Sequence, residues 1–226
     1  MHFVTFDLDG TLADSEAFDG ELYVEAVRSV LGVDIEADWT GYRHRTDGGI
    51  LNEIIDRSIP NADRASLHSA VRRHFTDQVH DYVAARGGVI PEIPGAMQFV
   101  SRLRKHPSVR VAVATGGWKE TALIKLRAIG LDPLRLPLAS SSDAMSKVDI
   151  MRISERRTLP NGNAKRKTYF GDSRYDKEVS RKLGYGFIAI GENVDHHLRY
   201  PNFLDAESII DNLGLNGSPR VGPTVG

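Results

Sequence analysis

The chain has 226 residues, of which 41% are hydrophobic and 26% charged, which is typical of a globular protein and excludes a disordered or fibrous one. Because 29 basic residues nearly balance 30 acidic ones, nucleic acid is not expected as a partner, and no apolar stretch approaches the roughly 18 residues of a membrane span. There is no cysteine for thiolate chemistry, and the first residues lack the pattern of a signal peptide, so we expect a cytoplasmic protein.

The N-terminal segment predicts a buried strand that ends in acidic residues. Residues 3–6 are apolar, and Asp7-Leu8-Asp9-Gly10 follows directly. Side chains two residues apart in an extended segment share a face, so the carboxylates of Asp7 and Asp9 are expected together at the strand end. Two such charges about 4 Å apart cost on the order of 4 kcal/mol at an effective dielectric near 20, so the pair requires a cation or a shared proton. An ordinary turn built from good turn residues is the alternative.

The segment from residue 15 to 92 has the apolar spacing of helices and no convincing strand. Apolar residues recur there at helical intervals in three stretches, residues 18–30, 51–59 and 67–83. We therefore predict an all-helical insertion over residues 15–92, within an α/β core of residues 1–14 and 93–213. Residues 214–226 are rich in Gly and Pro and are predicted to be a flexible tail.

Beyond this segment, short apolar runs alternate with stretches of helical length. Strands are expected at residues 109–114, 134–139, 168–170 and 186–190. Helices are expected at residues 117–129, 147–157 and 174–183. This alternation predicts a doubly wound parallel sheet of the Rossmann-like α/β class.

Polar residues follow several of these predicted strands. Thr115 and Gly116 come after one strand, Asp172 and Asp176 after another, and Lys147 lies beyond a third. Taken singly, each has an ordinary explanation: a strand-to-helix turn, a helix N-cap or a solvated lysine. Because the carboxyl ends of parallel strands converge on one edge of the sheet, a single shared site explains them better together.

The order of these motifs resembles the haloacid dehalogenase-like (HAD) hydrolase superfamily, in its phosphatase type with a helical C1 cap. The segments that carry the resemblance are Asp7-Leu8-Asp9-Gly10-Thr11-Leu12, Thr115, Lys147, and Gly171-Asp172 with Asp176. Lys147 lacks the proline that commonly follows this lysine in the family, and Lys165 and Lys167 lie nearby as alternative candidates.

The resemblance implies hydrolysis of a small phosphorylated metabolite through an aspartyl-phosphate. Asp7 would be the nucleophile, and Asp9 would protonate the leaving oxygen and later activate water. One Mg²⁺ would be held by Asp7, the backbone carbonyl of Asp9 and Asp172. Dehalogenase relatives lack an acid two places after the nucleophile, because a halide leaves without a proton, so Asp9 favours phosphate monoester hydrolysis.

The resemblance also assigns residues to the phosphoryl group. Thr115, the amide of Gly116 and Lys147 would hold its oxygens, and Asp176 would orient water or Lys147. A sugar phosphate mutase of the same architecture keeps both catalytic acids and is the main alternative. A non-catalytic module that binds phosphate or metal is the other. Either a monomer or a homodimer is expected.

The loop between the first two predicted cap helices is the densest cationic and aromatic cluster of the cap. Residues 39–49 contain Arg43, His44 and Arg45 together with two aromatic side chains. Similar C1 caps carry their specificity loop here, and arginine binds carboxylate or phosphate through two parallel hydrogen bonds. We therefore expect these residues to recognise a second anionic group of the substrate. A solvated connection between helices is the alternative.

Overall fold

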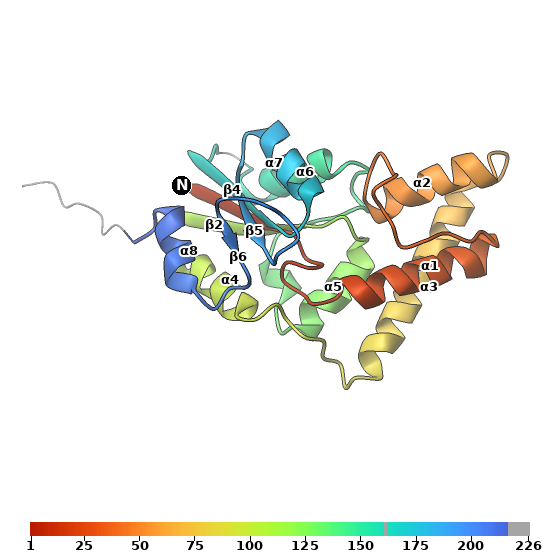
Figure 1. Ribbon diagram of the computed structural model, residues 1–226, viewed down its shortest axis with the longest axis horizontal. Coiled ribbons are helices and arrows are strands. Elements are labelled where there is room, and N and C mark those ends of the chain that lie inside the picture. The colour runs from red at the N-terminus through yellow and green to blue at the C-terminus, as the bar shows by residue number, and fades with distance from the viewer. Residues whose placement is uncertain (161, 217–226) are drawn as a thin grey trace, which may run out of the picture.

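A parallel sheet forms the centre of the larger part of the molecule (Figure 1). The computed structural model describes residues 1–160 and 162–216, and within them the sheet has six strands in the order β3-β2-β1-β4-β5-β6. The strands are β1 (His2–Phe6), β2 (Val109–Ala114), β3 (Leu138–Ala139), β4 (Arg166–Gly171), β5 (Gly186–Ile190) and β6 (Arg199–Tyr200). Neighbouring strands are parallel throughout, which confirms the predicted fold class.

Helices cover both faces of this sheet, because successive side chains of a strand point to opposite faces. The helices are α4 (Ala96–Lys105), α5 (Lys119–Ala128), α6 (Lys147–Thr158), α7 (Arg174–Leu183) and α8 (Ala206–Leu213). Val4 and Phe6 of β1 belong to the hydrophobic cluster that includes residues of α4, α5 and α8. Phe3 points to the other face, in the cluster that contains residues of α6 and α7. The sheet is therefore doubly wound.

Three helices follow β1 and form the second part of the molecule, to the right in Figure 1. They are α1 (Glu16–Leu31), α2 (Asp47–Ser58) and α3 (Arg64–Ala84), and we refer to them together with their connections as the helical cap. Most of their buried side chains form a separate hydrophobic cluster around Leu51, Ile55 and Phe75, which Trp118 of the core joins. Phe18 and Val83 belong instead to the cluster on the sheet. No described helix combines the length and apolarity needed to cross a membrane.

The register of the central strands places their carboxyl ends together. Phe6 at the end of β1 pairs with Val113 of β2 on one side and with Phe170 of β4 on the other. The backbone N–H of Asp7 continues this pairing by donating to the carbonyl of Phe170 at 2.9 Å. The residues that follow these three strands therefore meet at one edge of the sheet.

The prediction of a strand over residues 134–139 is wrong in its first half. Pro133–Arg135 forms a 3-10 turn, which begins at Asp132, whose carboxylate accepts from the N–H of Leu134 at 2.9 Å. Leu134 is 90% exposed, so its apolar character reflects no buried strand. Helices α4 and α8 and strand β6 were not predicted. Of the predicted tail, residues 217–226 lie outside the described residues.

Candidate active site

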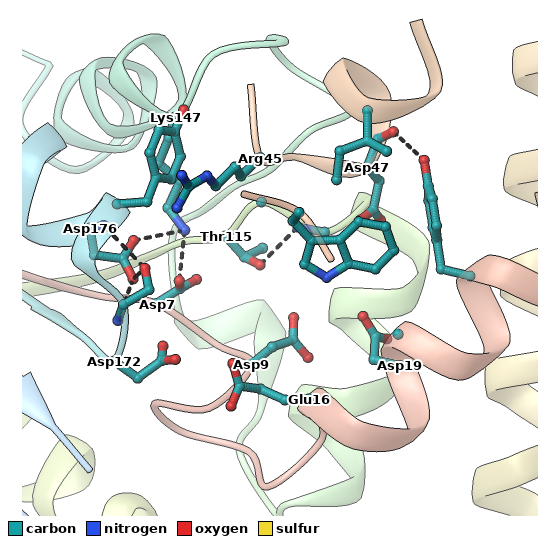
Figure 2. Close-up of a pocket in the computed structure, with 18 of the residues that line it drawn as sticks. Asp7, Asp9, Glu16, Asp19, Arg45, Asp47, Thr115, Lys147, Asp172 and Asp176 are labelled. Atoms are coloured by element: carbon teal, nitrogen blue, oxygen red, sulfur yellow. Dashed lines mark hydrogen bonds and ion pairs between the residues drawn. The ribbon is translucent and has the colours of Figure 1, made fainter. Parts of the chain in front are cut away.

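A cavity of about 370 Å³ lies where the carboxyl edge of the sheet meets the helical cap (Figure 2). Its lining from the sheet side includes Asp7, Asp9, Thr115, Gly116, Lys147, Asp172 and Asp176. Its lining from the cap includes Asp19, Tyr23, Trp39, Arg45 and Asp47. The structure thus brings every residue predicted at the four strand ends to one cavity.

Two hydrogen bonds hold the carboxylate of Asp7 at the cavity. Its Oδ1 accepts from the N–H of Leu8 at 2.8 Å, and its Oδ2 accepts from Nζ of Lys147 at 2.7 Å. Burial raises the pKa of Asp7 to about 7 against the opposing effect of the Lys147 ammonium, and the charge of Asp176 adds to the rise. Further positive charge beside Asp7 would lower this pKa and favour the carboxylate form.

Three buried carboxylates gather around this point. One oxygen each of Asp7, Asp172 and Asp176 lies within 4.8 Å of the others. Burial raises the pKa of Asp172 well above its usual range, and the charges of Asp176 and Asp7 raise it further. Within the described residues, Oδ1 of Asp176 accepts no hydrogen bond, although Nζ of Lys147 lies 3.5 Å from it. Three acids against one ammonium leave an excess of negative charge, and oxygen ligands are those that Mg²⁺ prefers, so the residues fit this ion.

Local backbone geometry turns Asp172 toward the cavity. The N-cap of α7 is Ser173, whose hydroxyl accepts from the N–H of Asp176 at 3.1 Å, so the alternative of Asp172 as the N-cap is wrong. Asp172 instead accepts from the hydroxyl of Thr11 at 3.0 Å. Gly10 has φ of 70°, which favours glycine, and a Cβ there would lie 2.6 Å from Oδ2 of Asp172. A side chain at position 10 would therefore collide with the Asp172 carboxylate in its present place.

Lys147 is the lysine that the structure brings to the cavity. It is the first residue of α6 and is 3% exposed. The alternative candidates lie elsewhere. Lys167 of β4 pairs with Phe3 near the N-terminal end of β1, away from the cavity, and its ammonium contacts Glu155 at 2.6 Å. Lys165 donates its backbone N–H to the carbonyl of Met1. Neither lines the cavity.

The turn after β2 joins the core to the cap. The hydroxyl of Thr115 accepts from the N–H of Gly117 at 3.1 Å, and the carbonyl of Gly116 accepts from the N–H of Asp47 at 2.9 Å. Asp47 is the first residue of α2, and its carboxylate accepts from the N–H of Trp118 at 2.8 Å. Burial raises the pKa of Asp47 well above its usual range. This partly buried acid was not predicted to be part of the site.

Among the described residues, only one oxygen of Asp9 accepts hydrogen bonds. Its Oδ1 accepts from the hydroxyl of Ser15 at 2.5 Å and from Nζ of Lys125 at 2.5 Å. Lys125 also donates to Asp19 of α1 at 2.8 Å. Sequence reasoning missed Lys125 because it lies inside a helix, where lysine is normally solvated; the available signal was its place on the buried face, between Ala122 and Leu126.

The structure brings only part of the predicted cap cluster to the cavity. Arg45 lines it, with its guanidinium carbon 5.4 Å from the ring centre of Tyr175. Arg43 is exposed and donates its backbone N–H to Glu53 at 2.7 Å, and neither it nor His44 lines the cavity. The other charged side chains that the cap contributes to the lining are acidic, namely Glu16, Asp19, Asp38 and Asp47.

Comparison with known proteins identifies the family. The family model described as haloacid dehalogenase-like hydrolase matches residues 4–190, which is most of the chain. The chain belongs to this family of hydrolases, as its motifs predicted. No curated protein matches it in sequence.

Solved structures with the same fold cover nearly the whole chain. A hydrolase from Pseudomonas syringae has a TM-score of 0.69 at 20% identity over 94% of this chain and 99% of its own. CbbY from Rhodobacter sphaeroides, solved with phosphate, has a TM-score of 0.67 at 19% identity over 89% and 94%. The β-phosphoglucomutase of Clostridium difficile has a TM-score of 0.67 at 11% identity over 93% and 96%.

Proposed function

We propose that this hydrolase is a HAD-type phosphatase that cleaves the phosphate monoester of a small metabolite with the help of Mg²⁺. The observation that carries the proposal is the placement of two acids, Asp7 and Asp9, at one cavity beside the Lys147 ammonium. An acid two residues after the nucleophile supplies the proton that an alcohol leaving group needs. The similarity to a structure solved with phosphate supports the same substrate class.

In the first step, the carboxylate of Asp7 attacks phosphorus, and the bond from phosphorus to the leaving oxygen breaks. Asp9 gives its proton to that oxygen, and an aspartyl-phosphate remains on Asp7. In the second step, Asp9 takes a proton from a water molecule that attacks the same phosphorus. Asp7 then leaves as a carboxylate, and inorganic phosphate is released.

Three groups position the phosphoryl oxygens, and three others would hold the ion. Thr115, the N–H of Gly116 and Lys147 hold the oxygens while charge moves between them. Asp7, the backbone carbonyl of Asp9 and Asp172 would hold Mg²⁺, whose charge offsets that of the phosphate and the acids. Asp176 orients the Lys147 ammonium by an ion pair, since its Oδ1 lies 3.5 Å from Nζ.

A sugar phosphate mutase is the second candidate function. It uses the same two acids, and the β-phosphoglucomutase structure is as similar in fold as the phosphate-bound one. A regulatory module without catalysis is the third, and against it stands a complete set of acids, hydroxyl and lysine at the cavity. Product analysis with a hexose phosphate separates the first two, because a mutase returns an isomer and a phosphatase releases phosphate.

The proposal is tested by turnover of p-nitrophenyl phosphate, followed by a screen of phosphorylated metabolites for released phosphate. We expect turnover that stops in excess chelator and returns with Mg²⁺. A folded protein that binds phosphate and Mg²⁺ but releases no phosphate from any monoester would contradict the proposal and favour the regulatory module.

A further inference from the structure

A second lysine, Lys125, is buried behind the cavity and has no part in the steps above. It projects from α5, its side chain is 0% exposed, and it does not line the cavity. Its ammonium contacts Oδ1 of Asp9 at 2.5 Å and Oδ1 of Asp19 at 2.8 Å. One cation therefore connects an acid of the core to an acid of the first cap helix.

The helix does not need a charge at this position. The neighbouring buried side chains of α5, Ala122 and Leu126, are apolar, and a Met or Leu at this position would avoid the desolvation cost of a buried ammonium. Burial acts to lower the pKa of Lys125, but the two acids outweigh it and raise the pKa above its usual value. The ammonium is thus retained for the acids that it contacts.

The two oxygens of Asp9 have different surroundings. Ser15 and Lys125 both donate to Oδ1, whereas no described residue donates a hydrogen bond to Oδ2. A Cβ built on Gly117, another residue of the cavity lining, would lie 3.6 Å from Oδ2. Two donors on one oxygen prevent rotation of the carboxyl and leave the other oxygen for a substrate.

We propose that Lys125 is a positioning residue that locks the Asp9 carboxyl with Oδ2 toward the leaving oxygen of the substrate, and that Asp19 anchors Lys125 in this place. The inference rests on the proposed function, in which Asp9 is the acid and base. Because Asp19 belongs to α1, the placement of Asp9 also depends on the position of the helical cap.

A purely structural role and a positioning role predict different dependence on the leaving group. An alcohol leaves only with a proton from Asp9, whereas p-nitrophenolate leaves without one. Loss of the contact between Lys125 and Asp9 should therefore slow phosphoryl transfer from an alkyl phosphate much more than transfer from p-nitrophenyl phosphate. General loss of structure would slow both reactions alike.

The experiment compares Lys125→Met and Asp19→Asn with Arg127→Met, which removes an exposed cation from the same helix. For Lys125→Met we expect kcat/KM for glycerol 2-phosphate to fall at least about a hundredfold, the usual size of acid catalysis. Phosphorylation by p-nitrophenyl phosphate should persist and appear as a rapid burst of p-nitrophenolate, because hydrolysis of the phosphoenzyme becomes slow. Asp19→Asn should give the same pattern with a smaller loss, and Arg127→Met should behave as the wild type.

Equal losses for the two substrates, or no loss for either, would overturn the inference. Thermal unfolding shows whether Lys125→Met folds; if it does not, Asp19→Asn carries the test, since Asn keeps the size of Asp. A wild type without phosphatase turnover would overturn the proposed function and this inference together. An active wild type in which Asp9→Asn shows the burst and both lock variants do not would overturn this inference alone.

Discussion

The two buried lysines of this protein are similar in surroundings and different in access. Lys147 and Lys125 each contact two carboxylates, and both are nearly or fully enclosed. Lys147 contacts Asp7 and lines the cavity, so its ammonium can bind an incoming phosphate. Lys125 contacts Asp9 and does not line this cavity, so in our proposal it acts only through that acid. Under the proposed mechanism, one buried lysine binds phosphate and the other positions an acid.

The largest effect is expected from the acid beside Lys147. Asp7→Asn removes the nucleophile while preserving its size, so turnover should fall at least about a thousandfold. Steady-state release of phosphate measures this, and thermal unfolding shows that the variant is folded. Turnover like that of the wild type would exclude covalent catalysis by Asp7.

Metal binding is the next difference between the surroundings of the two lysines. Within the part of the chain that the structure describes, a cluster of three acids with oxygens within 4.8 Å of one another is found beside Lys147 and not beside Lys125. Mg²⁺ at about a hundred times its Kd should stabilise the metal-free protein by about 2.7 kcal/mol, measured as a rise in Tm. Asp172→Asn should abolish this rise, and Asp195→Asn, which changes an exposed acid, should not. Ca²⁺ should not restore activity after chelation, since its preference for more ligands allows both oxygens of Asp7 to bind it. An unchanged rise in Asp172→Asn would contradict the assignment.

Binding of inorganic phosphate tests the difference in access directly. Lys147→Met should weaken phosphate as a competitive inhibitor about a hundredfold, the loss of one hydrogen bond between charged groups. Lys125→Met should change the inhibition constant less than about threefold, because its ammonium is sealed from the cavity. Equal weakening in both variants would show that the two lysines do not differ in role.

Two arginines of the cap also differ in their access to the cavity. Arg45 lies over Tyr175 at the cavity, whereas Arg43 is exposed away from it. Arg45→Ala should lower kcat/KM for the best anionic metabolite about tenfold, or about 1.4 kcal/mol, and hardly affect p-nitrophenyl phosphate. Arg43→Ala serves as the matched control and should change neither substrate. A loss in Arg43→Ala alone would place the specificity element outside the cavity.

The smallest effect concerns Asp47, whose pKa is raised first by burial and then by Asp19. An acid with a raised pKa in the folded state binds its proton more tightly there, so the wild type loses stability as pH rises above about 4, the unfolded value. Asp47→Asn keeps an acceptor for the N–H of Trp118 and should flatten this part of the pH curve. Its free energy of unfolding at pH 5 should lie within about 1 kcal/mol of the wild type, measured by denaturant titration. A pH curve identical to that of the wild type would contradict the assignment.

The residues at the sheet edge could be predicted because each one lies next in the sequence to a recognisable strand. Asp7, Thr115 and Asp172 each follow a buried strand directly, and parallel strands bring such positions together. The fold class followed from the same alternation of strands and helices. The first half of the strand over residues 134–139 was predicted wrongly, because the pattern treated Leu134 as buried although its side chain is exposed.

The cap side of the cavity could not be predicted because it depends on contacts between residues that are far apart in the sequence. Lys125 meets Asp9 across more than a hundred residues, and helical spacing alone does not tell a buried ammonium from a solvated one. Charge density in the loop suggested Arg43, His44 and Arg45, but of these three only Arg45 lines the cavity. Composition predicts which residues a loop contains, and packing decides which of them face inward.

We propose that Asp7 carries the phosphoryl group while Asp9 moves the protons. The most direct measurement uses Asp9→Asn, which accepts phosphate from p-nitrophenyl phosphate but lacks the base that hydrolyses the intermediate. Rapid acid quench followed by mass spectrometry of the digested protein should find one phosphoryl group, on the peptide that contains Asp7. A label on Asp172 or Asp176, or release of p-nitrophenolate by Asp9→Asn without any label on the protein, would contradict the account.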